Sequence, residues 1–296
     1  MEKPTSELPF ISNLKSFLQE LLLALPGKEL GENVIEFQKF LKNVDLCYII
    51  HLDEKGNILL DPSTLDSLNL PETVRKILVY LGDQMEPNLS EPYKNLFVQT
   101  YLEFKSSSQP AADIWLKQML RDHGGVLSGY GVIEELLKNT KLPTIFETIR
   151  PGSVHLLQEE KPEKGYAMIK EAVQYSFKVL CVSKLEPNKV KNRYRLKNVQ
   201  IVWLTFNKTK EKSIMPDDLD GLKFLVSKIG LGSVVMFDCF NEIKLVNSFK
   251  VALEFLKELK ELCVKRRLAL VLSIDPKKLT EEQVLALERV MEVSKK

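Results

Sequence analysis

Apolar residues in the first part of the chain recur at the spacing of amphipathic helices. Between Phe10 and Leu25 they return every three or four positions, and Pro26-Gly27 then predicts the end of a helix. A second helix is predicted over 34–41. Further helices are predicted over 71–85, 90–105, 110–122 and 132–137, and we expect the chain to break at His123-Gly124-Gly125.

One β-hairpin is predicted among these helices. The apolar runs 47–52 and 58–60 flank a short loop over 53–57 that contains Gly56. Residues 1–144 are therefore expected to form a mostly helical α+β domain with one hairpin.

The pattern changes after residue 144, where short apolar runs alternate with helical stretches. Strands are predicted over 154–157, 179–182, 199–204, 234–237 and 268–274. Helices are predicted over 163–176, 187–194, 217–229, 245–264 and 279–293. Alternation of helices with nearly all-apolar strands is typical of a parallel sheet that is covered on both faces. We place the domain boundary within 141–151 and expect residues 145–296 to form an α/β domain.

Composition narrows the class of protein. A chain of 296 residues with 44% apolar residues can bury the cores of two domains. It has no run of 18 apolar residues, so we expect no membrane-spanning helix, and the N-terminus lacks the layout of a signal peptide, which predicts a cytoplasmic protein. Four scattered cysteines favour buried free thiols over a zinc site or disulfides. Abundant lysine and glutamate beside three histidines is a balance reported for hyperthermophile proteins.

Charge is distributed unequally between the two halves. Residues 1–144 carry 14 Lys and Arg against 20 Asp and Glu, a formal charge of −6. Residues 145–296 carry 28 against 20, a formal charge of +8. This asymmetry fits two domains that dock on each other, or one domain that meets an acidic partner.

Five segments of the second half carry a resemblance to a known family. They are Gly152-Ser153-Val154, Val182-Ser183 with Glu186-Pro187, Ile201–Thr205, Val235–Phe240 and Ser273-Ile274-Asp275-Pro276. On these segments, residues 145–296 resemble an archaeal domain-of-unknown-function family related to the KaiC/RecA-like ATPases. The resemblance implies a RecA-like parallel sheet sandwiched by helices, and it implies no assigned activity.

The phosphate-binding loop of such ATPases is missing from this sequence. A P-loop of the form G-x-x-x-x-G-K-[ST] cradles phosphates with its backbone N–H groups, and its lysine reaches the terminal phosphates. The corresponding place offers only Gly165, with Tyr166 where Ser or Thr would bind magnesium, and Pro162 has no N–H to donate. We therefore expect no ATP hydrolysis, no catalytic residue, no metal and no cofactor.

Polar residues at three predicted strand ends form a weak candidate nucleotide site. Ser183, Asp238 and Asp275 each follow an apolar run, at the edge where open α/β sheets bind ligands. Asp238 stands where a P-loop ATPase would hold its magnesium ion. The other interpretation, which we favour, is an aspartate that caps the turn into residues 239–241.

A basic run forms the second candidate site. Its members are Lys189, Lys191, Arg193, Arg195 and Lys197, and Lys208, Lys210 and Lys212 repeat the spacing. Contacts from lysine and arginine to phosphate would make this run a nucleic-acid surface. The other interpretation, which we favour, is a solvated basic rim that docks on an acidic domain or partner.

The remaining chemistry-bearing residues are assigned structural roles. Tyr93, Phe97, Tyr101 and Phe104 form one stripe with Trp115 nearby, which fits a ligand pocket or, as we favour, a helix core. His155 is expected in the core and His123 in a turn, and no Ser-His-Asp triad is expected.

The leading hypothesis is a non-catalytic interaction or regulatory protein built on a degenerate ATPase fold. Its partner would be another protein or a second copy of the chain. The alternatives are a divergent nucleotide-binding protein and nucleic-acid binding through residues 189–212.

Overall fold

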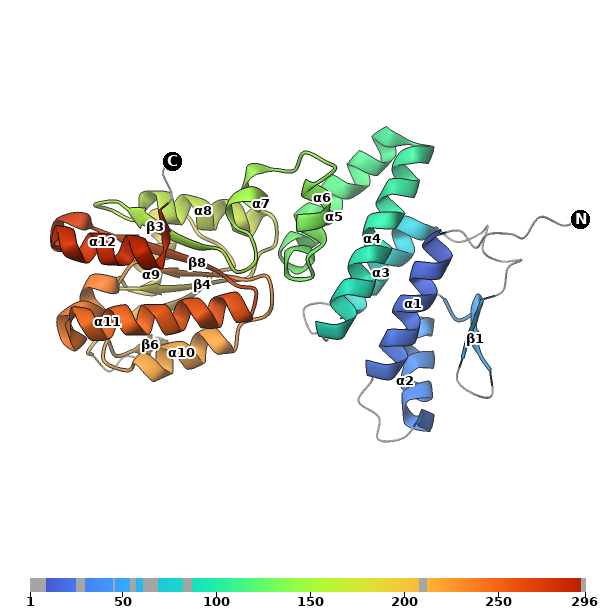
Figure 1. The fold of residues 1–296 in the computed structure, drawn as a ribbon, viewed down its shortest axis with the longest axis horizontal. Coiled ribbons are helices and arrows are strands. Elements are labelled where there is room, and N and C mark those ends of the chain that lie inside the picture. Colours follow the sequence, from blue (N-terminus) through green and yellow to red (C-terminus); the bar gives the residue numbers. More distant parts are fainter. Residues whose placement is uncertain are drawn as a thin grey trace, which may run out of the picture. The chain divides into compact units, whose positions relative to one another are not determined.

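The computed structural model describes residues 9–24, 30–44, 46–53, 57–60, 69–81, 87–207 and 212–293. The chain divides into two compact units, Met1–Met119 with Tyr130–Asn139 and Leu120–Gly129 with Thr140–Lys296. The first unit is built mainly of helices, and the second is an α/β structure (Figure 1). A division into domains 1–144 and 145–296 stays a prediction.

The first unit has the expected helices and the expected hairpin. The helices are α1 (Pro9–Ala24), α2 (Leu30–Asn43), α3 (Leu70–Leu81), α4 (Pro87–Ser107), α5 (Gln109–Gly129) and α6 (Val132–Leu137). The second half of α5, from Leu120, belongs to the second unit. Strands β1 (Ile50–Leu52) and β2 (Ile58–Leu60) pair antiparallel. The predicted helix end at Pro26-Gly27, the end of the predicted helix at 82–85 and part of the hairpin loop lie outside the described residues.

The core of this unit forms where α1 packs against α4. Tyr93, Phe97 and Tyr101 are fully buried, and the Phe17 ring meets Tyr93 edge-on at 5.9 Å between centroids. The favoured core interpretation of the aromatic stripe is therefore confirmed for these three residues. Phe104 and Trp115 are only partly buried.

The expected chain break at His123-Gly124-Gly125 is wrong, because α5 runs through these residues to Gly129. Glycine weakens a helix by about 1 kcal/mol relative to alanine, so a packing reason is needed. A Cβ on Gly124 would lie 2.8 Å from the Tyr175 carbonyl oxygen, and a Cβ on Gly125 would lie 2.7 Å from the Phe177 Cα. The two glycines allow a close approach of backbones, and His123 is a helical residue.

The second unit contains a parallel sheet, as the strand pattern predicts. Its strands are β3 (Val154–Gln158), β4 (Val179–Ser183), β5 (Gln200–Leu204), β6 (Ser213–Ile214), β7 (Val234–Phe237), β8 (Ala269–Ile274) and β9 (Glu292–Val293). Within the described residues their order is β6-β5-β4-β7-β8-β3-β9, and all neighbours pair parallel. The two-residue edge strands β6 and β9 are not among the predicted strands, because so short a segment forms no apolar run. The predicted helix 279–293 is wrong at its end, since the helix stops at Val290 and Glu292–Val293 form β9.

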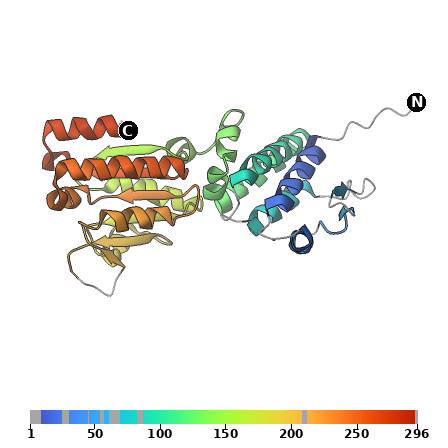
Figure 2. The same ribbon diagram turned by 60° about the horizontal axis from the view of Figure 1, so that its bottom comes forward.

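Helices cover both faces of the sheet. They are α7 (Thr144–Thr148), α8 (Glu163–Gln174), α9 (Pro187–Tyr194), α10 (Leu219–Ser227), α11 (Phe240–Lys265) and α12 (Glu281–Val290), with a 3-10 turn at Pro276–Lys278. Figure 2 shows α10, α11 and α12 side by side, and their apolar residues share one core with the strands. Helices α8 and α9 lie on the other side. This arrangement confirms the α/β fold and is consistent with a RecA-like sheet.

Helix α11 departs from the predicted span 245–264 at its start. It begins at Phe240, and Ser248 interrupts it with non-helical torsions, φ 66° and ψ 158°. The apolar stripe that gave the prediction starts at Phe249, because the first segment has a different buried face that includes Phe240 and Ile243.

Two further expectations concern thiols and membranes. Cys181, Cys239 and Cys263 are buried and Cys47 is partly buried, and all four are free thiols, as expected. No helix in the described part of the chain combines the length and apolarity needed to cross a membrane.

Candidate functional site

The carboxyl ends of β4 and β7 lie at a topological switch point of the sheet. From β4 the chain passes through α9 to β5 on one side, and from β7 it passes through α11 to β8 on the other. Ligands of open α/β sheets bind in the crevice outside such a point. The register pairs Val182 with Phe237, so the residues that follow, Ser183 and Asp238, are neighbours at this edge.

Asp238 is buried and accepts three hydrogen bonds. Its Oδ2 accepts from Tyr166 Oη at 2.8 Å and from Ser183 Oγ at 2.9 Å. Its Oδ1 accepts from the Lys184 backbone N–H at 3.1 Å. Burial raises the pKa of Asp238 above its usual value, although the hydrogen bonds oppose the rise. The carboxylate is thus held by these three residues rather than by the turn at 239–241 that the favoured sequence interpretation assigned to it.

Strand alternation explains why these side chains meet. Val235 and Phe237 belong to the core under α10–α12, so Asp238 points to the opposite face, where α8 lies. Tyr166, in the first turn of α8, reaches Asp238 from that face and stacks on Tyr194 at 3.9 Å between ring centroids. The burial of Tyr166 and the nearby Asp238 carboxylate raise the pKa of its hydroxyl, so Tyr166 is a hydrogen-bond donor here.

A second carboxylate holds the start of α8 itself. Glu159 Oε2 accepts from the Lys164 N–H at 2.8 Å, and its Oε1 accepts from the Gly165 N–H at 3.1 Å. Ser273 Oγ, from the end of β8, donates to the same Oε1 at 2.8 Å. A helix N-terminus favours an anion because its first N–H groups lack partners within the helix. The Glu159 carboxylate supplies that anion from within the chain.

Asp275, the third predicted site residue, makes its hydrogen bond away from the other two. Asp275 caps the 3-10 turn after β8 and accepts from the Lys277 N–H at 3.1 Å. Within the described residues, no hydrogen bond or ion pair joins Asp275 to Ser183 or Asp238. Of the predicted trio, hydrogen bonding therefore connects only Ser183 and Asp238.

The start of α11 lines the same edge of the sheet. Lys184 Nζ lies 3.7 Å from Glu242 Oε1, which links the end of β4 to α11. Asn241 Oδ1 and Glu242 Oε2 are buried, and neither accepts a hydrogen bond from the described part of the protein. These two oxygens are acceptors that the sequence interpretation did not identify.

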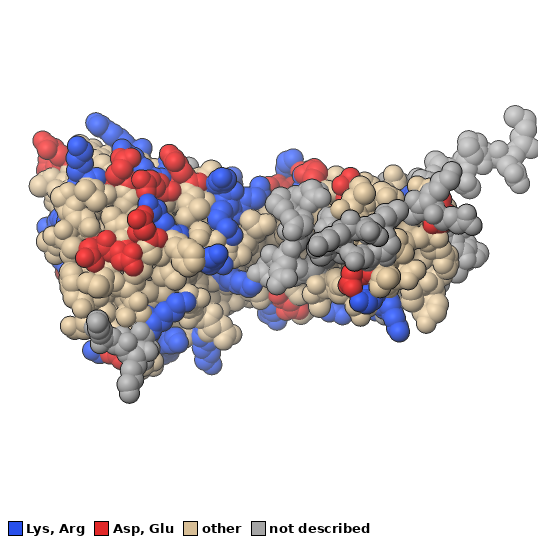
Figure 3. Space-filling view, turned by 90° about the horizontal axis from the view of Figure 1, so that it is seen from below, with Lys and Arg blue, Asp and Glu red and all other residues tan. Residues whose placement is uncertain are grey.

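The basic run lies on α9 and the loop after it. Lys189, Lys191, Arg193, Arg195 and Lys197 are all exposed, whereas Lys208 and Lys210 lie outside the described residues. Lys189 pairs with Glu186 at 3.5 Å, and Arg193 pairs with Glu163 at 3.1 Å. Blue basic and red acidic side chains also intermingle over the α/β unit in the view of Figure 3.

The sequence analysis did not identify Glu159. It considered Tyr166 only as a residue that replaces the Ser or Thr of a P-loop. Glu159 precedes a helix start, which is a usable signal, because acidic side chains are favoured near helix N-termini. No group of three or more His, Cys, Asp or Glu that could bind a metal ion occurs in the described ranges. His155 is partly buried, and its Nε2 lies 2.9 Å from Ser153 Oγ.

Comparison with known families finds a match in the α/β unit. Residues 158–291, from the end of β3 to the start of the segment after α12, match the family described as "Protein of unknown function (DUF835)". The match agrees with the expected resemblance to a family without an assigned activity. A comparison with curated proteins found no match to the chain.

Proposed function

We propose that residues 145–296 form a degenerate ATPase-like domain that acts by binding a partner and carries out no chemistry. The observation that carries this proposal is the position of Glu159. Its carboxylate accepts from the Lys164 and Gly165 N–H groups at the start of α8, where a P-loop would present such groups to phosphate. A nucleotide phosphate would have to displace this carboxylate.

The state of Asp238 supports the same proposal. A magnesium ion needs carboxylate oxygens that can coordinate it, usually together with phosphate oxygens and water. Both oxygens of Asp238 already accept hydrogen bonds, and Tyr166 covers the carboxylate from α8. Binding a metal there would break contacts that are buried within the fold. The relation to KaiC/RecA-like ATPases and an archaeal, thermophilic source remain part of this proposal.

Mg-ATP titration by calorimetry tests the proposal. We expect no saturable heat with the native chain at millimolar Mg-ATP, because the two positions that would hold phosphate and magnesium are filled. Asp238→Asn is the matched control, since it keeps the side chain's shape and one acceptor oxygen but removes the charge that would hold magnesium. Micromolar binding to the native chain that is lost in Asp238→Asn would contradict the proposal.

One observation favours the alternative of a divergent nucleotide-binding protein. Asn241 Oδ1 and Glu242 Oε2 are buried acceptors beside the switch point, and a ligand with N–H or O–H donors would satisfy them once the two side chains turn toward it. The same titration separates the two proposals, because this alternative requires saturable binding of ATP. Under this alternative, the Asn241→Ala variant would bind ATP more weakly than the native chain.

The basic run is less suited to nucleic acid than to a protein partner. Two of its five described cations are already compensated by Glu186 and Glu163, so fewer charges remain to replace counterions on phosphates. The domain's formal charge of +8 still favours an acidic partner, which we propose is another protein or a second copy of the chain.

A further inference from the structure

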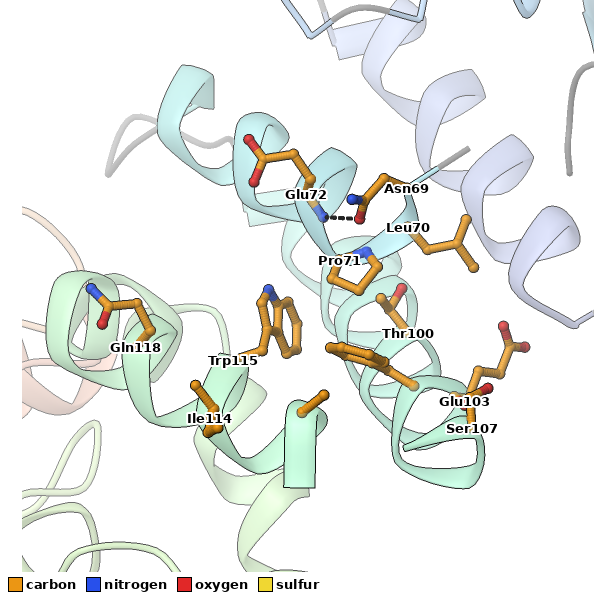
Figure 4. Close-up of a pocket in the computed structure, with 12 residues that line it drawn as sticks. Asn69, Leu70, Pro71, Glu72, Thr100, Glu103, Ser107, Ile114, Trp115 and Gln118 are labelled. Carbon is orange, nitrogen blue, oxygen red and sulfur yellow. Dashed lines mark hydrogen bonds between the residues drawn. The ribbon is translucent and has the colours of Figure 1, made fainter. Parts of the chain in front are cut away.

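A pocket opens within the helical unit beside Phe104 and Trp115, which the sequence analysis considered as part of a ligand pocket or a helix core. It lies between the start of α3, the second half of α4 and α5, and its volume is about 710 Å³ (Figure 4). Sites for small organic molecules in proteins usually enclose roughly 300–1,000 Å³. The pocket is therefore large enough for a small organic ligand.

The wall of the pocket is apolar and partly aromatic. Leu70 and Pro71 contribute from α3, Phe104 from α4, and Ile114 and Trp115 from α5. Trp115 faces Pro71 and Thr100 in Figure 4, and its ring meets Phe104 edge-on at 6.3 Å between centroids. Phe97 stacks on Trp115 at 5.1 Å, which holds the indole in place. An aromatic wall fixed in this way suits a hydrophobic ligand body.

The charge of the pocket is negative. Glu72 and Glu103 line it, and no lysine, arginine or histidine does so among the described residues. The Glu72 carboxylate is already paired with Arg75, at 2.6 and 2.8 Å. Glu103 instead accepts from the neutral Gln99 amide at 3.0 Å and pairs with no cation in the part of the chain that the structure describes. Glu103 is thus the uncompensated charge.

One side-chain donor in the wall of the pocket is closed off from solvent. The indole Nε1 of Trp115 is buried and finds no acceptor among the described residues. A buried N–H without an acceptor is unfavourable, and most such groups in native proteins are paired. Because this N–H has no accessible surface, a ligand in the pocket would contact the Trp115 ring and not its Nε1.

We propose that this pocket binds an amphipathic organic ammonium compound. The ammonium group would lie beside Glu103, and the apolar body would extend toward Trp115, which lies on the other side of the pocket in Figure 4. The apolar body would cover Leu70, Pro71 and Ile114, and Ile114 is 71% exposed. This inference is independent of the function proposed for residues 145–296.

Three probes of equal chain length test the charge preference. Octylammonium and octanoate are titrated below their micelle concentrations and octanol below its solubility limit, with tryptophan fluorescence as the signal. We expect saturable octylammonium binding about fivefold tighter than octanol binding, the size of one charge contact at a partly exposed site, and the weakest binding for octanoate. Because Trp115 and Trp203 are the two tryptophans, the signal should persist in Trp203→Phe and vanish in Trp115→Phe.

Variants then locate the ammonium group. Glu103→Gln keeps the acceptor for Gln99 and should remove the preference for octylammonium over octanol. Glu91→Gln, on the outer side of α4 and paired with Lys94, is the matched control and should leave the preference unchanged. Ile114→Lys changes an exposed position, so folding is preserved, and it should weaken octylammonium binding.

Three results would overturn the proposal. They are octylammonium binding no tighter than octanol, a preference that survives in Glu103→Gln, and the absence of any saturable change in Trp115 fluorescence.

Discussion

Asp238 shows how a residue that looks functional in the sequence is used within the fold. It ends a buried strand at the edge where α/β proteins bind ligands, which singles it out as a candidate site residue. The structure joins it to Tyr166, Ser183 and Lys184, so that it connects the start of α8 with the end of β4. At the scale of single residues, the Asp238 carboxylate is a hydrogen-bond acceptor that joins two elements of the fold.

Stability should therefore depend on pH through Asp238. Its raised pKa means that the folded protein binds the proton more tightly than the unfolded chain does. This contribution to stability is complete below the usual carboxyl pKa of about 4 and is lost as pH rises through the raised pKa of the folded state. Asp238→Asn removes it, so the stability of the variant relative to the native chain should increase between pH 4 and pH 7.

Urea unfolding at several pH values measures this effect. Asp238→Ala is the comparison, and it should cost roughly 3 kcal/mol, because it leaves the Tyr166 and Lys184 donors without their acceptor. A stability difference between Asp238→Asn and the native chain that is the same at every pH would contradict the account.

The candidate site was only partly predictable from single residues. Ser183 and Asp238 could be identified because each follows an apolar strand, and parallel strands end at one edge. Their partner Tyr166 lies 72 residues from Asp238 in the sequence, and no local pattern indicates such a contact. Glu159 gave a signal, an acidic residue before a helix, but its contact with Ser273 depends on the pairing of β3 with β8.

At the scale of elements, most helices and strands follow from the apolar pattern, and the exceptions have physical causes. The glycines in α5 predict a break by propensity, and close packing of backbones overrides it. Helix α11 begins earlier than predicted, because its two segments bury different faces on either side of Ser248. Local propensity describes an isolated segment, whereas these features depend on neighbours that are distant in sequence.

Gly125→Ala tests the packing explanation by the sign of its effect. Helix propensity alone predicts a gain of about 1 kcal/mol. We expect a loss of about 2 kcal/mol or more instead, since the new Cβ would lie 2.7 Å from the Phe177 Cα and 2.9 Å from the Ser176 carbonyl oxygen. The free energy of unfolding in urea gives the answer.

Gly165→Ala is the comparison for this prediction. Its nearest neighbour would be Met236 Cε at 2.5 Å, the end of a flexible side chain that can move away. We therefore expect a smaller loss than for Gly125→Ala. A stabilised Gly125→Ala variant would show that the backbone contact does not determine the choice of glycine.

At the scale of the whole molecule, the α/β unit combines a sheet that is well suited to ligand binding with an edge that its own side chains occupy. Glu159 and Tyr166 both come from the segment between β3 and the first turn of α8. The sequence of this segment contains no G-x-x-x-x-G-K-[ST] motif. The fold could be predicted because each strand is an apolar run in the sequence. The hydrogen bonds at the sheet edge could not be predicted, because they depend on contacts between segments that are distant in sequence.

The most direct test follows the amide groups of Lys164 and Gly165 by NMR as Mg-ATP is raised to millimolar concentration. These N–H groups bind Glu159, and they are the groups that would contact phosphate if a nucleotide were bound at the start of α8. The account predicts that both amide resonances stay where they are. Saturable shifts of the two resonances, with a dissociation constant below about 1 mM, would contradict it.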